Sequence, residues 1–134
     1  MRAAWWLLGF AVAGCTARGG VVVEPRPEVL RDVEGYAVAS CLTLPPQPWL
    51  RDQGDAWASV ILQRMQGGPE ALVGVAEAVR REEAKGDMAV IRDETGPARG
   101  KALPLLHCGE SVDRPAVRAA IRQAVVALAP FYRE

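Results

Sequence analysis

Apolar residues recur at spacings of three and four along most of the chain from residue 28 onward, and proline or glycine interrupts the pattern at intervals. This spacing places apolar side chains on one face of a helix, whereas a half-buried strand needs strict alternation. No alternating stretch in the sequence rivals these stripes. The sequence therefore predicts an all-α fold, a small bundle of about five short helices within residues 28–134.

Each predicted helix has an apolar stripe, and all but the fourth are followed by a residue that ends them. The first three are marked by Leu30, Val33, Ala37, Val38 and Cys41 before Pro45, Pro46 and Pro48; by Trp57, Val60, Ile61 and Met65 before Gly67; and by Leu72, Val75, Ala76 and Val79 before Gly86. The last two are marked by Ala102, Leu105, Leu106 and Cys108, and by Val117, Ala120, Ile121, Ala124, Val125 and Leu128 before Pro130. Asp52 or Asp55 is the expected cap of the second helix, Pro69 fits the first turn of the third, and Asp113 is the expected cap of the last.

The charge composition excludes some classes of partner. The chain has 16 basic and 16 acidic residues, so its formal net charge is zero. Binding to phosphates or to an anionic membrane surface needs a basic face, which this balance does not supply. We therefore expect no nucleic-acid partner.

The N-terminus is typical of a bacterial export signal. Met1 and Arg2 precede an apolar run over residues 3–13. That run is shorter than the roughly 20 residues that a membrane-spanning helix needs. Residues 1–14 are therefore predicted to be a signal peptide of the lipoprotein type, because Val12, Ala13 and Gly14 precede Cys15 as in a lipobox.

Lipid attached to Cys15 would anchor the chain to a membrane. Because Thr16 rather than Asp follows Cys15, the usual sorting rule does not retain the protein at the inner membrane, and we expect an outer-membrane anchor facing the periplasm. Residues 15–27 are predicted to be a flexible tether. An ordinary cleaved signal and an uncleaved anchor remain as alternatives.

The other two cysteines form an even pair in an oxidising compartment. Cys41 and Cys108 are therefore predicted to form a disulfide. Closing so long a loop could contribute roughly 4 kcal/mol of stability in the chain-entropy model. The alternative, a catalytic Cys108 activated by His107, is disfavoured because helix neighbours point about 100° apart.

Enzyme signatures are missing from the sequence. It contains no glycine-rich phosphate loop, no metal-ligand cluster and a single histidine. The adjacent carboxylates Glu82-Glu83 and Asp93-Glu94 are interpreted as solvated surface. Trp57 is expected in the core and Trp49, among prolines, at an exposed contact. We expect a binding protein with no catalytic residues, no metal and no cofactor.

Several segments together resemble one protein family. These are the run Gly35-Tyr36-Ala37-Val38-Ala39-Ser40-Cys41, the helix near Ala58, the run Leu105-Leu106-His107-Cys108, and a terminal apolar helix ending in Phe131-Tyr132. They are similar to the type VI secretion amidase immunity family. The resemblance implies an exported helical protein with a cystine at Cys41 and Cys108. It also implies a homodimer that binds and blocks a peptidoglycan amidase delivered by rival cells, although the lipobox-like Cys15 departs from the family's ordinary signal.

In that family, a loop between helices enters the amidase cleft, and residues 87–100 are the natural candidate here. Met88, Val90 and Ile91 fit either a strand or a docked turn, and the charged residues that follow predict partner contacts by Arg92, Asp93 and Glu94. A solvated surface loop is the alternative. Two other functions stay open: a lipid-anchored envelope scaffold or assembly protein without enzymatic activity, and a small hydrolase or carrier of hydrophobic ligands.

Overall fold

The computed structural model describes residues 27–88, 90–92 and 100–132, with only the backbone of Arg92. The predicted signal peptide, Cys15, most of the predicted tether, Asp93 and Glu94 lie outside these residues. Within them, none of the helices has the length and apolar character to cross a membrane.

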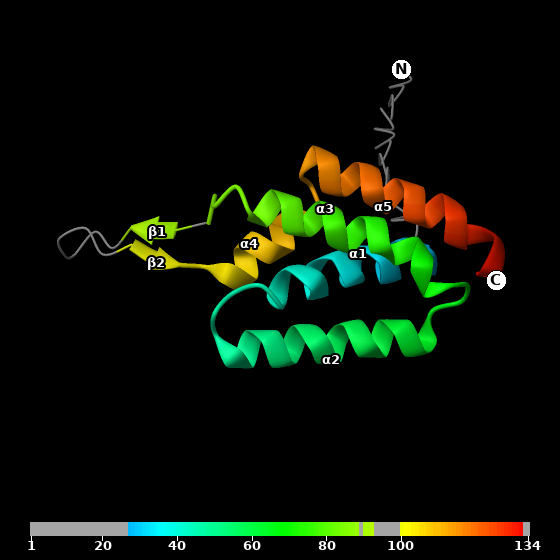
Figure 1. The fold of residues 1–134 in the computed structure, drawn as a ribbon, viewed down its shortest axis with the longest axis horizontal. Coiled ribbons are helices and arrows are strands. Elements are labelled where there is room, and N and C mark those ends of the chain that lie inside the picture. The colour runs from blue at the N-terminus through cyan, green and yellow to red at the C-terminus, as the bar shows by residue number, and fades with distance from the viewer. Residues whose placement is uncertain (1–26, 89, 93–99, 133–134) are drawn as a thin grey trace, which may run out of the picture.

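The described residues confirm the predicted all-α fold (Figure 1), and they confirm the predicted disulfide between Cys41 and Cys108. The α-helices are α1 (Glu28–Leu42), α2 (Pro48–Arg64), α3 (Val73–Glu83), α4 (Pro104–Ser111) and α5 (Pro115–Leu128). Two short 3-10 helices accompany them, η1 (Pro69–Leu72) and η2 (Ala129–Phe131). Two short strands, β1 (Val90–Arg92) and β2 (Gly100–Ala102), lie between α3 and α4.

Helix α1 lies at the centre of the bundle. It packs against α2 on one side and against α3, α4 and α5 on the other, and α3 also packs against α5 (Figure 1). The apolar core consists mainly of side chains of α1, η1, α3 and α5 with almost no exposed surface: Val33, Ala37, Leu72, Val75, Val79, Val117, Ile121 and Leu128. Burial of this shared stripe is the main stabilising contribution.

Helix α2 packs as an outer layer, and its contact with α1 depends on a glycine. Gly54 is buried, and a Cβ atom there would lie 2.7 Å from the backbone oxygen of Ala39. Only Leu50, Gly54 and Ile61 of this helix are buried. The expectation that Trp57 and Val60 lie in the core is wrong, because they are 41% and 51% exposed.

Proline, rather than a capping side chain, begins most helices. Pro48, Pro69, Pro104 and Pro115 occupy the first turn of α2, η1, α4 and α5, and none of these elements has a side-chain cap. Proline suits this turn because its missing N–H would have had no intrahelical partner. The predicted caps Asp52, Asp55 and Asp113 are therefore wrong, as is the assignment of Pro48 to the end of the first helix.

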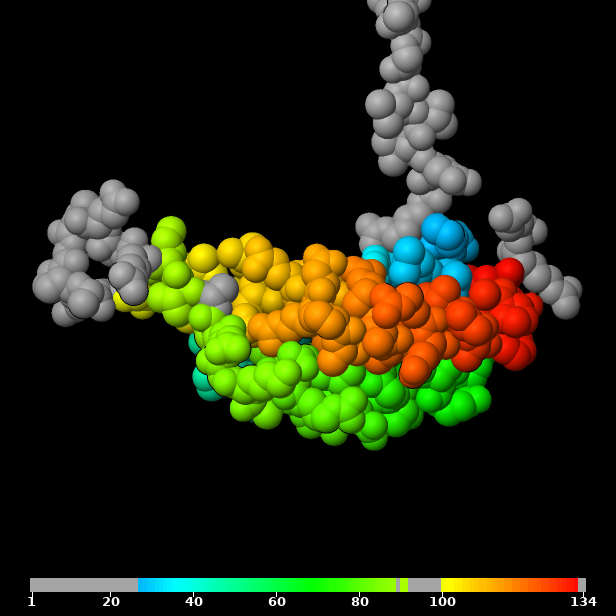
Figure 2. Space-filling model, turned by 90° about the horizontal axis from the view of Figure 1, so that it is seen from above, coloured from blue at the N-terminus to red at the C-terminus, as the bar shows by residue number. Residues whose placement is uncertain are grey.

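Strands β1 and β2 form an antiparallel hairpin that extends from the end of the helical body near the start of α4 (Figures 1 and 2). Val90 pairs with Ala102, and Arg92 pairs with Gly100. This resolves the choice between strand and docked turn in favour of a strand. The predicted stripe of the fourth helix is wrong: Ala102 belongs to β2, and Leu105 and Leu106 are 57% and 49% exposed.

Candidate functional site

The predicted disulfide joins Cys41 of α1 to Cys108 of α4, with Cα atoms 5.5 Å apart. Both residues have no exposed surface. Because the Cys108 sulfur is bonded to another sulfur, it is not a nucleophilic thiolate in this state. The disulfide instead holds the short helix α4 against the central helix.

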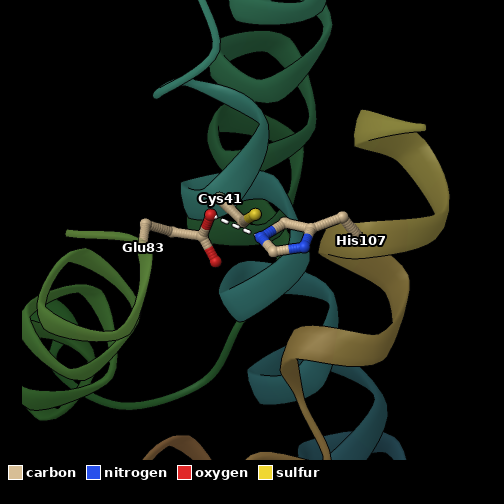
Figure 3. A group of neighbouring side chains, drawn as sticks. All are labelled: Cys41, Glu83 and His107. Carbon is tan, nitrogen blue, oxygen red and sulfur yellow. Dashed lines mark hydrogen bonds and ion pairs between the residues drawn. The ribbon is translucent and has the colours of Figure 1, made fainter. Parts of the chain in front are cut away.

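Beside the disulfide lies a largely buried polar group, which we call the Glu83 cluster: Glu83, His107 and Arg114. Figure 3 shows the Glu83 and His107 side chains facing each other next to Cys41. The His107 Nε2 atom lies 2.7 Å from Glu83 Oε2. Arg114 Nη1 lies 3.4 Å from Glu83 Oε1, and Arg114 Nη2 lies 3.2 Å from His107 Nε2. The cluster links the end of α3 to α4 and to the residue that precedes α5.

The interpretation of Glu82 and Glu83 as solvated surface is wrong. Each of these two side chains is 13% exposed, and that of His107 is 4% exposed. Glu83 follows Val75 and Val79 at intervals of four, so it continues the buried stripe of α3. That periodicity is the signal that could have found it.

A carboxylate beside a histidine is an arrangement that can orient a general base or a metal ligand. Here the nearest sulfurs are joined in the disulfide. Donor atoms of Cys41, Glu83 and His107 all lie within 4.8 Å of one another. A sulfur within a disulfide offers no thiolate, so these residues do not form a thiolate metal site in the oxidised protein.

A second polar group, centred on the buried Asp32, ties the C-terminal segment to the bundle. Arg64 Nη2 lies 2.6 Å from Asp32 Oδ1, and the Tyr132 hydroxyl donates to Asp32 Oδ2 at 2.9 Å. Burial and this hydrogen bond raise the pKa of Tyr132 to about 12. Asp32 is 3% exposed, so this ion pair is structural and was not anticipated from the sequence.

A third ion-pair group crosses the N-terminal end of α5. Arg118 donates to Glu34 of α1 and to Asp113, the latter at 2.6 Å. Hydrogen bonding to Glu34, and then to Asp113, raises the pKa of Arg118 above its ordinary value. Asp113 therefore contributes an ion pair to α5 instead of the predicted cap.

Exposed apolar side chains gather where the hairpin meets the helices. Trp49 is 56% exposed and stands in the first turn of α2. It lines a cavity of about 530 Å³ together with Leu50, the β2 residues Lys101 and Ala102, and residues 103–106. We call this cavity the Trp49 groove.

The hairpin itself is largely exposed. Val90 and Ile91 of β1 are each 53% exposed, and all three residues of β2 are exposed. An isolated two-stranded hairpin is marginally stable in water, and its open edges can pair with another chain.

The structure thus brings predicted contact Trp49 and the hairpin to one end of the molecule. Arg92 ends β1, but its side chain lies outside the described residues, as do Asp93 and Glu94. Their predicted partner contacts stay predictions. The Trp49 groove itself was not anticipated, because its lining residues come from three separate elements.

Comparisons with protein-family models, with curated proteins and with solved structures find no match to this chain.

Proposed function

We propose that the protein is a periplasmic immunity protein that binds a type VI secreted peptidoglycan amidase and blocks its active site. The amidase belongs to rival cells, and the protein protects the cell that makes it. The proposal assigns no reaction, metal or cofactor to the chain. Its observational support is the exposed hairpin beside the Trp49 groove.

An inhibitor that works by occlusion needs an element that reaches beyond its own body into a cleft of its partner. The hairpin has this form, because the helical bundle narrows to two exposed strands at one end (Figure 2). Its sequence continues into Asp93 and Glu94, which we propose as contacts with the amidase active site. A carboxylate from this segment can accept a charge-assisted hydrogen bond from a catalytic histidine.

The Trp49 groove supplies the second part of the proposed interface. Its apolar walls and the exposed Trp49 ring match the composition of interface hot spots, which favour tryptophan. Lys101 adds a cation at its rim, where an acidic residue of the partner can pair with it. The groove would receive an apolar side chain beside the cleft that the hairpin enters.

The sequence features of the N-terminus complete the proposal. Lipid on Cys15, with residues 16–27 as a tether, would hold the helical domain in the periplasm at the outer membrane. This is the compartment in which a peptidoglycan amidase acts and in which a disulfide persists.

A scaffold or assembly role in the cell envelope is the second candidate. The observation that favours it is the apolar exposure along α2, where Trp57, Val60 and Leu62 are each more than two-fifths exposed. Exposed apolar residues on one helix are typical of a surface that meets another protein.

Co-expression in the periplasm tests the proposal. The full chain is produced with the protein encoded next to it, and cell lysis and complex formation are scored. We expect rescue from lysis with a tight complex, and loss of both when Arg92, Asp93 and Glu94 are all changed to alanine. A neighbour that is not toxic and forms no complex would overturn the proposal in favour of the scaffold.

A further inference from the structure

The disulfide and the Glu83 cluster bring four groups that can bind a metal close together, and Figure 3 shows three of them, Cys41, Glu83 and His107. Cys41 Sγ, a Glu83 carboxylate oxygen and a His107 ring nitrogen lie within 4.8 Å of one another, and Cys108 Sγ is bonded to Cys41 Sγ. We propose that reduction of the Cys41–Cys108 disulfide converts this point into a Zn²⁺ site with Cys41, Cys108, His107 and Glu83 as ligands. This inference is independent of the proposed immunity function.

The donor types fit zinc. Two thiolates, one imidazole nitrogen and one carboxylate oxygen make a tetrahedral set of the kind that Zn²⁺ prefers. With ordinary zinc–ligand bond lengths, neighbouring donors of a tetrahedron lie about 3.3 to 3.8 Å apart. From their limit of 4.8 Å, the three donors of Cys41, Glu83 and His107 therefore need to converge by about 1 to 1.5 Å at most.

The ligands come from three elements that the bundle already holds in place. Cys41 lies on α1, Glu83 ends α3, and His107 and Cys108 are neighbours on α4. Side chains of helix neighbours diverge, but Glu83 pairs with His107 and Cys41 is bonded to Cys108. Figure 3 shows the Glu83 and Cys41 side chains beside the His107 ring.

One carboxylate oxygen of the proposed site, Glu83 Oε1, makes no hydrogen bond among the described residues. It is buried, and its contact with Arg114 is an ion pair at 3.4 Å. A buried carboxylate oxygen without a hydrogen bond carries a desolvation cost that metal coordination removes.

The charges of the site also balance. Two thiolates and one carboxylate carry one more negative charge than Zn²⁺ carries positive charge. The guanidinium of Arg114, which already contacts Glu83 and His107, lies where it can neutralise that excess.

The His107 side of the site lies next to a polar cavity. His107 and Arg114 line this cavity of about 540 Å³ together with three acidic residues, Asp87, Glu110 and Asp113. These acidic groups raise the local concentration of cations at its mouth.

The chemistry runs in two steps. A dithiol reductant gives two electrons and two protons to the S–S bond, which breaks into two thiols while the reductant becomes a disulfide. Zn²⁺ then binds both sulfurs as thiolates, and the two thiol protons pass to water. In the oxidised protein the sulfurs share their electrons with each other, and the His107 ring pairs with Glu83 instead.

The test uses the full chain with Cys15→Ser, so that only the two relevant thiols remain. Zn²⁺ is titrated against a chromogenic chelator, before and after treatment with a phosphine reductant. We expect no uptake by the oxidised chain and one Zn²⁺ for each reduced chain. His107→Ala and Glu83→Gln should each weaken zinc binding by about 10-fold or more, whereas Glu82→Gln, a matched exchange next to the site, should not change it.

Co²⁺ serves as a spectroscopic substitute and should show intense tetrahedral bands with thiolate charge transfer in the reduced chain. Far-UV circular dichroism reports whether the reduced chain is folded. Failure of the reduced chain to take up Zn²⁺, whether it is folded or unfolded, would overturn the proposal. Unchanged zinc affinity in both His107→Ala and Glu83→Gln would overturn it as well.

Discussion

The helical body and the hairpin of this protein differ in how much of their apolar surface is buried. In the body, residues such as Val33, Ile61 and Ile121 have no exposed surface, and the disulfide and three groups of ion pairs connect its helices. In the hairpin, Val90, Ile91 and all of β2 are exposed, although two of these residues are large and apolar. The body gains stability from burial, whereas the hairpin leaves apolar surface uncovered.

On the proposed function, this difference separates the residues that stabilise the fold from those that bind the partner. A small domain has little stability to lose, so apolar residues left in water indicate a use other than folding. Substitutions in the body should therefore change the free energy of unfolding. Substitutions at the hairpin and the Trp49 groove should change binding and leave folding intact.

The largest expected effect is the loss of stability on removing the disulfide, which lies wholly within the helical body. Replacing both Cys41 and Cys108 by alanine should lower the free energy of unfolding by about 4 kcal/mol, because the bond closes a long loop. The closed segment spans a sequence separation of 67 residues. Urea denaturation of the oxidised chain and of the variant, both with a chelator present, measures the difference. A loss below about 1 kcal/mol would mean that the bond does not staple the body.

Two tryptophans on α2 offer a matched test of the binding end. Trp49 and Trp57 are 56% and 41% exposed, but of the two only Trp49 lines the groove. Trp49→Ala should weaken affinity for the amidase by about 10- to 100-fold, the range of an interface hot spot. Trp57→Ala should leave that affinity unchanged, as isothermal titration calorimetry can show. Equal losses in the two variants would remove the distinction between the groove and the rest of α2.

Replacing two glycines of the helical body by alanine should change the free energy of unfolding in opposite directions. Gly54→Ala should cost about 2 kcal/mol of unfolding free energy, because the new Cβ meets backbone and cannot be accommodated by a side-chain rotation. A methyl group on Gly74 of α3 would meet no neighbouring element within 4 Å, so Gly74→Ala should stabilise the protein by about 0.5 kcal/mol. Thermal denaturation of both variants tests the pair. If both variants were destabilised, the close approach of α1 and α2 at Gly54 would not explain the loss in Gly54→Ala.

The smallest expected effect is a pH dependence at the C-terminal end. The pKa of Tyr132 is raised to about 12, above its ordinary value of 10.0, so the folded state holds this proton more tightly than the unfolded state. Its contribution to stability is complete below pH 10 and is lost as the pH rises toward 12. Tyr132→Phe should lower stability by about 1 kcal/mol at neutral pH and flatten the decline above pH 10. Urea denaturation at several pH values compares the two proteins, and parallel curves would contradict the assigned hydrogen bond.

The sequence predicts burial in the helical body well where one helix has an uninterrupted apolar stripe. The stripe of α5, with Val117, Ile121 and Leu128, is buried as expected because it follows the helical period without interruption. The disulfide was predictable because two cysteines remained for an oxidising compartment. Which residues of α2 and α4 are buried was not predictable, because burial depends on how many neighbouring elements cover each helix. Trp57 and Leu105 follow a helical stripe and are nevertheless exposed.

The candidate sites were less accessible to sequence reasoning. Trp49 was identified because it stands among prolines, but its groove is completed by residues 101–106, which no local pattern connects to it. The Glu83 cluster joins side chains from α3, α4 and the start of α5. A carboxylate adjacent to another in sequence gives no hint that a distant histidine pairs with it.

Amide hydrogen exchange of the full chain, alone and with the cognate amidase, tests the central claim most directly. We expect slow exchange throughout α1, α3 and α5 in both states, and fast exchange in the free hairpin because its backbone is exposed. Amidase binding should slow exchange in residues 90–102 and in the first turn of α2, with little change elsewhere. Protection confined to residues 57–64 of α2, with the hairpin unaffected, would contradict the account.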